Sequence, residues 1–172
     1  MAKQNCSVII LSKYQTLCHI INGNAILLKK ATRGISKGKW NAPGGKMDEG
    51  ETPEECAKRE VLEETGLVVS ELFCHGTMNF YLRGETTEPT IIGYIFSTHK
   101  FEGVLKSTEE GEVRWFKINR LPWRQMWPDD KYWLHLLLEG KRFSAKFYFD
   151  RENKNVIKYD IKEYADIRGS EP

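Results

Sequence analysis

The feature that most constrains the fold of this 172-residue chain is a helix signal that begins at Thr52 and ends at Gly66. Thr52 is a favourable N-cap residue, and Pro53 suits the first helical position because it needs no backbone hydrogen-bond partner there. Gly66 can take the left-handed conformation that closes a helix. The sequence therefore predicts a helix over residues 53–65, with both ends fixed by local chemistry.

That helix concentrates negative charge where it is least stable. Glu60, Glu63 and Glu64 are spaced by three and four residues and so share one helix face. The like-charged pair Glu60 and Glu64 costs about 0.2–0.5 kcal/mol, and carboxylates near a helix C-terminus cost up to ~1 kcal/mol each. A divalent cation would offset this repulsion, and oxygen ligands alone favour Mg²⁺ or Mn²⁺. The simpler alternative is a solvated acidic face.

The rest of the chain predicts a mixed α/β domain without internal repeats or linkers. Asn22-Gly23 between two apolar runs is a strong hairpin signal, and the Gly- and Lys-rich residues 31–45 predict a loop. A second helix is expected over residues 129–141, capped by Asp129 or Asp130 and ended by Gly140. Branched and aromatic residues predict strands within 67–82, 90–101, 112–118, 143–149 and 155–161.

Composition excludes several classes of protein. The formal net charge of +2 lacks the basic excess of a nucleic-acid-binding protein, so no stable nucleic-acid partner is expected. The longest apolar run near the N-terminus, residues 8–11, is too short for a signal peptide or a membrane span. Four scattered cysteines without a CxxC pair indicate reduced thiols. We therefore expect a cytoplasmic protein, either a monomer or a dimer.

The acidic helix lies within a longer pattern, G-x5-E-x7-R-E-U-x-E-E-x-G-U, where U is an apolar residue, which runs from Gly45 to Leu67. This pattern resembles the signature sequence of the Nudix hydrolases at every fixed position. The resemblance implies a single domain over residues 1–172 with the signature at 45–67 and a short tail at about 161–172. It also implies an α/β/α sandwich, in which a mixed sheet lies between helices, and Mg²⁺-dependent hydrolysis of a nucleoside diphosphate linked to another group. Mn²⁺ is the expected substitute for Mg²⁺.

The resemblance assigns roles residue by residue. Metal ligands would be the carbonyl of Gly44 and the carboxylates of Glu60, Glu63 and Glu64. Structural residues of the motif would be Gly45, Glu51, Arg59 and Gly66, with Glu51 and Arg59 forming an ion pair. Several Nudix enzymes add a distant loop glutamate as a ligand or base. Glu110 is the choice here, with Glu109 and Glu112 as neighbours, so the catalytic carboxylates would be Glu63, Glu64 and Glu110.

The segment "MWPDD", residues 126–130, indicates the substrate. Taken alone it predicts a helix start. Together with "GKWNAPGGK" and "FSAKFYF", it resembles the MutT-type branch of the family, which hydrolyses oxidised purine triphosphates such as 8-oxo-dGTP and 2-hydroxy-dATP. The resemblance covers about residues 20–160. It implies base contacts from Asn41, Phe80, Trp127, Asp129 and Asp130.

Other assignments stay open at this stage. A different Nudix substrate, such as ADP-ribose or a dinucleoside polyphosphate, is one alternative, and a non-catalytic nucleotide-binding module is another. Among the remaining tryptophans, Trp40 and Trp123 are better candidates for base contact than Trp115 and Trp133. The basic residues of the 29–39 region could attract a triphosphate or could simply be solvated.

Overall fold

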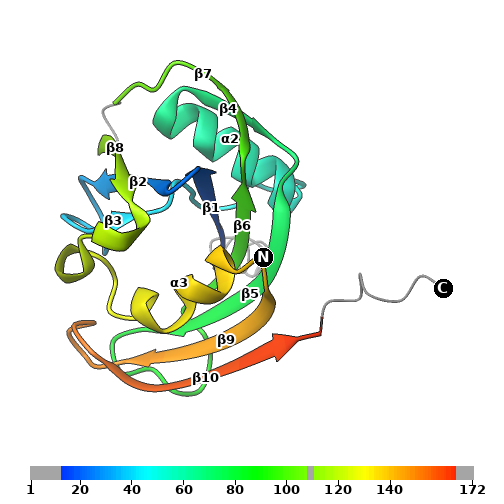
Figure 1. Ribbon diagram of the computed structural model, residues 1–172. Coiled ribbons are helices and arrows are strands. Elements are labelled where there is room, and N and C mark those ends of the chain that lie inside the picture. Colours follow the sequence, from blue (N-terminus) through cyan, green and yellow to red (C-terminus); the bar gives the residue numbers. More distant parts are fainter. Residues whose placement is uncertain (1–12, 108–110, 166–172) are drawn as a thin grey trace, which may run out of the picture.

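The protein folds as a curved mixed sheet with one helix on each face (Figure 1). The structure is a computed structural model that describes residues 13–107 and 111–165. Helix α2 (Pro53–Thr65) covers one face of the sheet and helix α3 (Asp130–Leu138) covers the other. This arrangement confirms the predicted α/β/α sandwich. No helix in the described ranges is long and apolar enough to cross a membrane.

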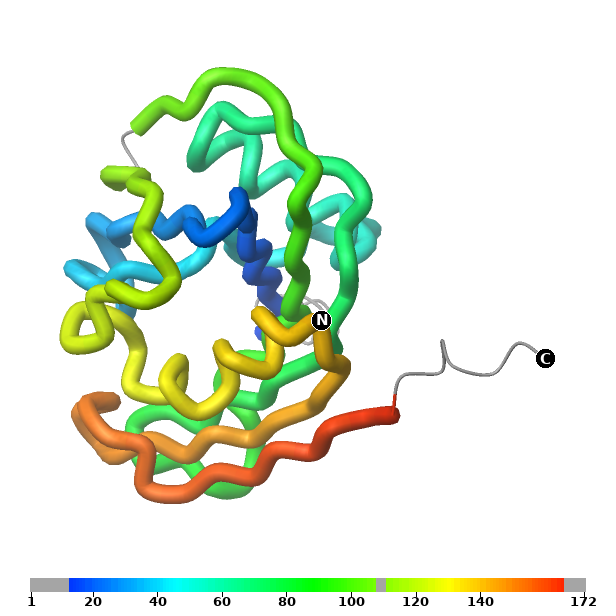
Figure 2. The backbone as a smooth tube through the Cα atoms, in the orientation of Figure 1, coloured from blue at the N-terminus to red at the C-terminus, as the bar shows by residue number. Residues whose placement is uncertain are grey.

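The main sheet has the strand order β10-β9-β5-β6-β1-β2-β3, and β8 pairs with β2. The sheet is mixed because β1 pairs with β6, and β5 with β9, in parallel, while the other pairs are antiparallel. Figure 2 shows β1 in the middle of the chain trace, between β6 and β2. The strands of this sheet are β1 (Tyr14–Asn22), β2 (Ala25–Ala31), β3 (Trp40–Asn41), β5 (Phe73–Tyr81), β6 (Ile91–Thr98), β8 (Gly111–Lys117), β9 (Arg142–Phe149) and β10 (Val156–Tyr164). A separate pair is formed by β4 (Leu67–Ser70) and β7 (Lys100–Gly103).

Side-chain alternation along β1 divides the interior into two cores. Cys18 and Ile20 pack with Val61 of α2, whereas Ile21 packs with Trp133 and Leu137 of α3. Successive residues of a strand point to opposite faces of a sheet. The central strand is therefore buried on both sides, and the α2 and α3 faces lie back to back across it.

The local predictions hold well for the regular elements. The Asn22-Gly23 turn joins β1 to β2, and residues 143–149 and 155–161 lie within the β9–β10 hairpin. The 67–82 segment divides into β4 and β5 at Glu71, whose φ of 49° interrupts the extended backbone.

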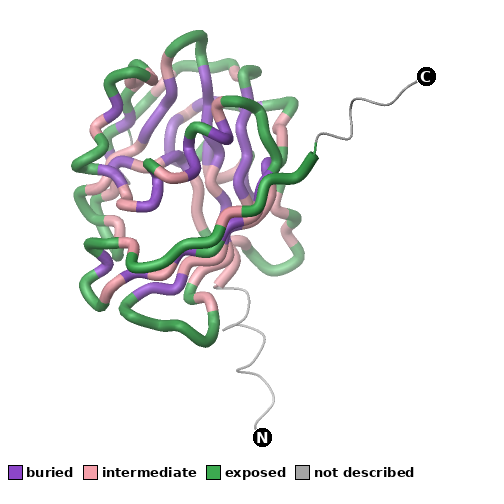
Figure 3. Tube along the Cα trace, turned by 60° about the horizontal axis from the view of Figure 1, so that its bottom comes forward, coloured by how far each residue is buried: buried purple, intermediate pink, exposed green. Residues whose placement is uncertain are grey.

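The C-terminal boundary differs from the sequence prediction. Residues 161–164, which we expected in a tail, belong to β10 at the edge of the sheet. Figure 3 shows that this strand is exposed along most of its length. The reason is that the antiparallel pairing with β9 continues as far as Tyr164, which lies opposite Arg142.

Candidate active site

Helix α2 has the ends that its sequence predicts. The Thr52 hydroxyl accepts a hydrogen bond from the backbone N–H of Glu55, and the Glu55 side chain accepts one from the backbone N–H of Thr52. This reciprocal pair satisfies two of the N–H groups that a helix start leaves open. Gly66 ends the helix with a φ of 75°. Both caps fix the register in which Glu60, Glu63 and Glu64 project.

Glu63 and Glu64, two of the three glutamates on the acidic face of α2, lie in different environments. Glu64 is buried, and its carboxylate accepts a 2.9 Å hydrogen bond from the backbone N–H of Gly44 and forms an ion pair with Lys29 of β2. The Glu63 side chain is 58% exposed, with its Oε2 3.4 Å from Arg59 Nη1. Burial raises the pKa of Glu64 to about 7, although Lys29 and the Gly44 N–H both favour its charged form.

The Gly44–Gly45 turn brings the backbone against this face of the helix. A Cβ at Gly44 would lie 2.0 Å from the carbonyl oxygen of Thr16, and one at Gly45 would lie 2.5 Å from the carboxyl carbon of Glu60. No side chain fits at Gly44, because the Thr16 oxygen belongs to the backbone, whereas a side chain at Gly45 would displace the Glu60 carboxylate. The loop therefore needs Gly44 in order to lie against β1, and Gly45 leaves room for Glu60.

Arg59 holds the preceding loop against the helix. Its Nε and Nη2 donate to the two carboxylate oxygens of Glu51 at 2.8 and 2.9 Å, and its Nη2 also donates to the carbonyl of Lys46 at 3.1 Å. This paired bond to Arg59 lowers the pKa of Glu51 to about 2. The same guanidinium reaches Glu60 at 2.8 Å, so it also offsets part of the repulsion between the carboxylates.

The structure does not assemble all of the expected metal ligands at one point. Among residues 13–107 and 111–165, no three acidic, histidine or cysteine side chains converge closely enough to hold a metal ion. Glu60 and Glu64 both face the Gly44–Gly45 turn, but Glu63 points toward Arg59. Glu110 lies outside the described residues. The donor set still fits a hard divalent cation, because every member is an oxygen and two of the carboxylates already flank one turn.

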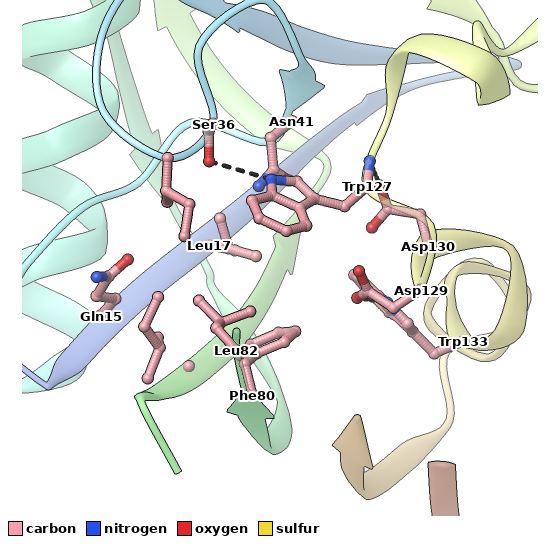
Figure 4. Close-up of a pocket in the computed structure, with 13 residues that line it drawn as sticks. Gln15, Leu17, Ser36, Asn41, Phe80, Leu82, Trp127, Asp129, Asp130 and Trp133 are labelled. Atoms are coloured by element: carbon pink, nitrogen blue, oxygen red, sulfur yellow. Dashed lines mark hydrogen bonds between the residues drawn. The ribbon is translucent and has the colours of Figure 1, made fainter. Parts of the chain in front are cut away.

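A second group of predicted residues meets in a single cavity. Asn41 from β3, Phe80 from β5, and Trp127, Asp129 and Asp130 from the start of α3 all line it. Its empty volume is about 610 Å³, part of which is open to solvent. In Figure 4 the Trp127 ring lies on one side of the cavity, Phe80 and Leu82 lie on the other, and the two aspartates point in from the α3 end.

The two aspartates are almost completely buried, with exposed fractions of 2% for Asp129 and 4% for Asp130. Asp129 Oδ2 accepts a 3.0 Å hydrogen bond from the indole N–H of Trp133, and Asp130 Oδ2 accepts a 3.1 Å bond from the backbone N–H of Trp127. Burial raises the pKa of Asp129 to about 6. It raises the pKa of Asp130 well above its usual value, and the Asp129 charge adds to that shift. A pair of this kind holds a proton near neutral pH and can donate as well as accept.

The structure confirms the N-cap position expected at Asp129 but not a capping hydrogen bond from its side chain. Asp129 occupies the N-cap position of α3, but its backbone is in the right-handed helical region and its side chain makes no capping bond. Both carboxylates instead bond to tryptophan N–H groups beside the cavity. The C-terminal end of α3 agrees with the prediction, since Gly140 follows the helix in the left-handed conformation with a φ of 72°.

The sequence missed part of the cavity wall. Trp133 lines it, whereas Trp40 and Trp123 do not. Trp40 is buried against Phe116, and Trp123 is exposed on the surface. Trp133 could have been found because it lies four residues after Asp129, one helical turn away on the same face. Other lining residues carry no local signal and come together only in three dimensions, namely Gln15, Leu17, Ile35, Ser36, Leu82, Ile91 and Gly93.

Known proteins define the class to which this fold and site belong. The NUDIX domain profile matches residues 13–137, so the chain belongs to the NUDIX family. Within that family it is 37% identical to the oxidized purine nucleoside triphosphate hydrolase of Mus musculus, over 88% of this chain and 96% of the mouse protein. The Danio rerio protein of the same name is also 37% identical, over 91% of this chain and 98% of its own. A crystal structure of a MutT protein from Bacillus halodurans superposes with a TM-score of 0.75 at 27% identity, covering 86% of this chain and 96% of that one.

Proposed function

We propose that this protein is a Mg²⁺-dependent nucleoside triphosphate pyrophosphohydrolase that clears oxidised purine triphosphates from the cytoplasmic nucleotide pool. Its substrates would be free nucleotides such as 8-oxo-dGTP and 2-hydroxy-dATP, and its products a nucleoside monophosphate and pyrophosphate. The observation that carries the proposal is the meeting of five predicted base-binding residues, from three separate segments, around one cavity. The names of the mouse and zebrafish relatives support the same substrate class.

The cavity is suited to a purine with an altered edge. Trp127 and Phe80 provide aromatic surfaces, and stacking on such a surface contributes about 1–3 kcal/mol per base. The amide of Asn41 and the proton-sharing pair Asp129 and Asp130 offer both donors and acceptors. Oxidation changes the pattern of donors and acceptors on a purine edge. A pair of carboxyl groups that can hold or release a proton can match that pattern.

The acidic face of α2 would hold the metal and, through it, the polyphosphate. Glu60, Glu63, Glu64 and the carbonyl of Gly44 are the proposed ligands, with Glu110 as an additional ligand from the 107–116 segment. Mg²⁺, or Mn²⁺ in its place, would supply charge neutralisation on the phosphates and a more acidic water. Glu63 would have to leave Arg59 to join this set, a rotation that its exposure permits.

Hydrolysis also needs a carboxylate that accepts a proton from the attacking water. Glu63, Glu64 and Glu110 are the candidates. The Glu51–Arg59 pair, Gly45 and Gly66 would act indirectly, because they hold the loop and the helix in the register that presents these carboxylates.

A substrate panel tests the proposal. The purified protein with Mg²⁺ is offered 8-oxo-dGTP, 2-hydroxy-dATP, dGTP, dATP, ADP-ribose and a dinucleoside polyphosphate. The products are separated and identified by ion-exchange chromatography, because ADP-ribose and dinucleoside polyphosphates release neither pyrophosphate nor phosphate. We expect the highest kcat/KM with an oxidised purine triphosphate, and no turnover with excess chelator. Preference for ADP-ribose or a dinucleoside polyphosphate would indicate another Nudix substrate class. Nucleotide binding without turnover would indicate a non-catalytic module.

A further inference from the structure

The loop formed by residues 32–39 lies across the cavity from the predicted base-reading aspartates. Its two ends are tied together, because the Ala31 N–H donates to the Lys39 carbonyl at 3.0 Å and the Gly38 N–H donates to the Ala31 carbonyl at 2.8 Å. The next residue along β3, Trp40, pairs with Lys30 of β2. The base of the loop is therefore anchored to the sheet.

The loop contacts Trp127 at two points, one near its middle and one at its end. The indole N–H of Trp127 donates a 3.0 Å hydrogen bond to the Ser36 hydroxyl, which Figure 4 shows beside the cavity. Lys39 Nζ lies 5.3 Å from the centre of the Trp127 ring, a cation–π distance, and donates to the Met126 carbonyl at 3.4 Å. The Trp127 side chain is therefore held from a segment 91 residues away in the sequence.

Trp127 also helps to position the carboxyl group of Asp130, which is predicted to contact the base. Its backbone N–H donates to Asp130, so the same residue carries an aromatic wall of the cavity and a hydrogen bond to one carboxyl group. Ile35, 42% exposed, adds an apolar side chain from the loop to the cavity wall. A shift of Trp127 would change the spacing between the stacking surface and the aspartates together.

We propose that loop 32–39 is a specificity element of the nucleotide site, in which Ser36 and Lys39 are positioning residues that lock Trp127 in the orientation needed to stack on the base. This inference rests on the proposed function for its substrate. It gives Lys39 a role different from attraction of the triphosphate, because the Lys39 ammonium is directed at the Trp127 ring and the Met126 carbonyl.

The test compares Ser36→Ala with Ser36→Thr, which keeps the hydroxyl, and with Ser70→Ala, which changes an exposed serine of β4 that does not line the cavity. For Ser36→Ala we expect KM for the best substrate of the panel to rise by about three- to tenfold, the range implied by one lost hydrogen bond, with kcat within about twofold. Ser36→Thr and Ser70→Ala should keep the wild-type KM. A wild-type KM in Ser36→Ala, a loss of kcat in place of affinity, or an equal defect in Ser36→Thr would overturn the proposal.

A second measurement needs no substrate. The chain has five tryptophans, and the indole N–H resonance of Trp127 is the one absent from the ¹H–¹⁵N spectrum of Trp127→Phe. We expect this resonance to shift in Ser36→Ala while the other four stay in place, which also shows that the variant is folded. An unshifted resonance would contradict the contact itself. If no oxidised purine triphosphate in the panel is hydrolysed but the resonance shifts, the proposed function is wrong and the anchoring of Trp127 by Ser36 still holds.

Discussion

The α2 face and the aspartate pair both crowd carboxyl groups together, yet they relieve the repulsion in different ways. On α2, Arg59 and Lys29 bring positive charge to Glu51, Glu60 and Glu64. Asp129 and Asp130 have tryptophan N–H donors and only a more distant influence of Lys39, so burial and mutual repulsion raise their pKa values. In the first arrangement the carboxylates are paired with side-chain cations that a metal ion would replace, although burial also raises the pKa of Glu64 to about 7. The aspartate pair holds a proton that it can donate in a hydrogen bond to the base.

If a metal ion binds at the acidic face of α2, replacing one of its carboxylates with a neutral amide should nearly abolish turnover. We expect Glu63→Gln and Glu64→Gln each to lower kcat by about a hundredfold or more, since loss of a metal ligand removes charge stabilisation of several kcal/mol. Far-UV circular dichroism should show the fold retained. Glu54→Gln, at an exposed position on the same helix, is the matched control. Near-normal activity in both Glu63→Gln and Glu64→Gln would refute the metal assignment.

The aspartate pair should control affinity for the base and leave metal binding unchanged. Asp129→Ala should weaken binding of the oxidised purine by about tenfold or more, because a hydrogen bond that involves a charged group contributes about 1.5–3 kcal/mol. Titration with Mn²⁺ should give a nearly unchanged metal affinity, which separates this site from α2. A variant that discriminates between oxidised and ordinary purines as the wild type does would remove Asp129 from base recognition.

The raised pKa of Asp129 predicts a pH dependence of stability and of base affinity. The pKa of Asp129 is raised from 3.8 to about 6, so the folded protein binds more protons than the unfolded chain between these values. The stability that this pair contributes is therefore present below about pH 4 and lost as pH rises through about 6. Affinity for the oxidised base should likewise change by several-fold as Asp129 ionises at about pH 6, because the pair then holds one proton in place of two. A flat binding profile across the acidic and neutral range would argue against proton sharing.

The smallest expected effect concerns the Glu51–Arg59 pair, which holds the loop and contacts no substrate in our proposal. Glu51→Gln should lower the free energy of unfolding by about 1–2 kcal/mol and Tm by about 2–6 °C. The pKa of Glu51 is lowered to about 2, so its contribution is present above about pH 4.5 and lost as pH falls toward 2. The Tm difference between wild type and Glu51→Gln should therefore shrink in acid. A constant difference would mean that the carboxylate charge is not what stabilises the loop.

The sequence by itself determined the elements whose causes are local. Thr52, Pro53 and Gly66 fixed helix α2, the Asn22-Gly23 pair fixed a hairpin, and the helical spacing placed three glutamates on one face. The residues expected around the base also met in one cavity, because the resemblance to a known family carried tertiary information that no local pattern contains.

Tertiary structure alone decided what those residues do in the folded protein. Burial beside Trp133 made Asp129, which occupies the N-cap position of α3, half of a proton-sharing pair. Lys29 of β2 came to pair with Glu64 of α2, and Ser36 came to accept a hydrogen bond from Trp127 across 91 residues of chain. Capping and periodicity depend on neighbours within a few residues, so a sequence displays them directly. Desolvation and long-range contacts depend on which segments the sheet brings together, and only the fold specifies that.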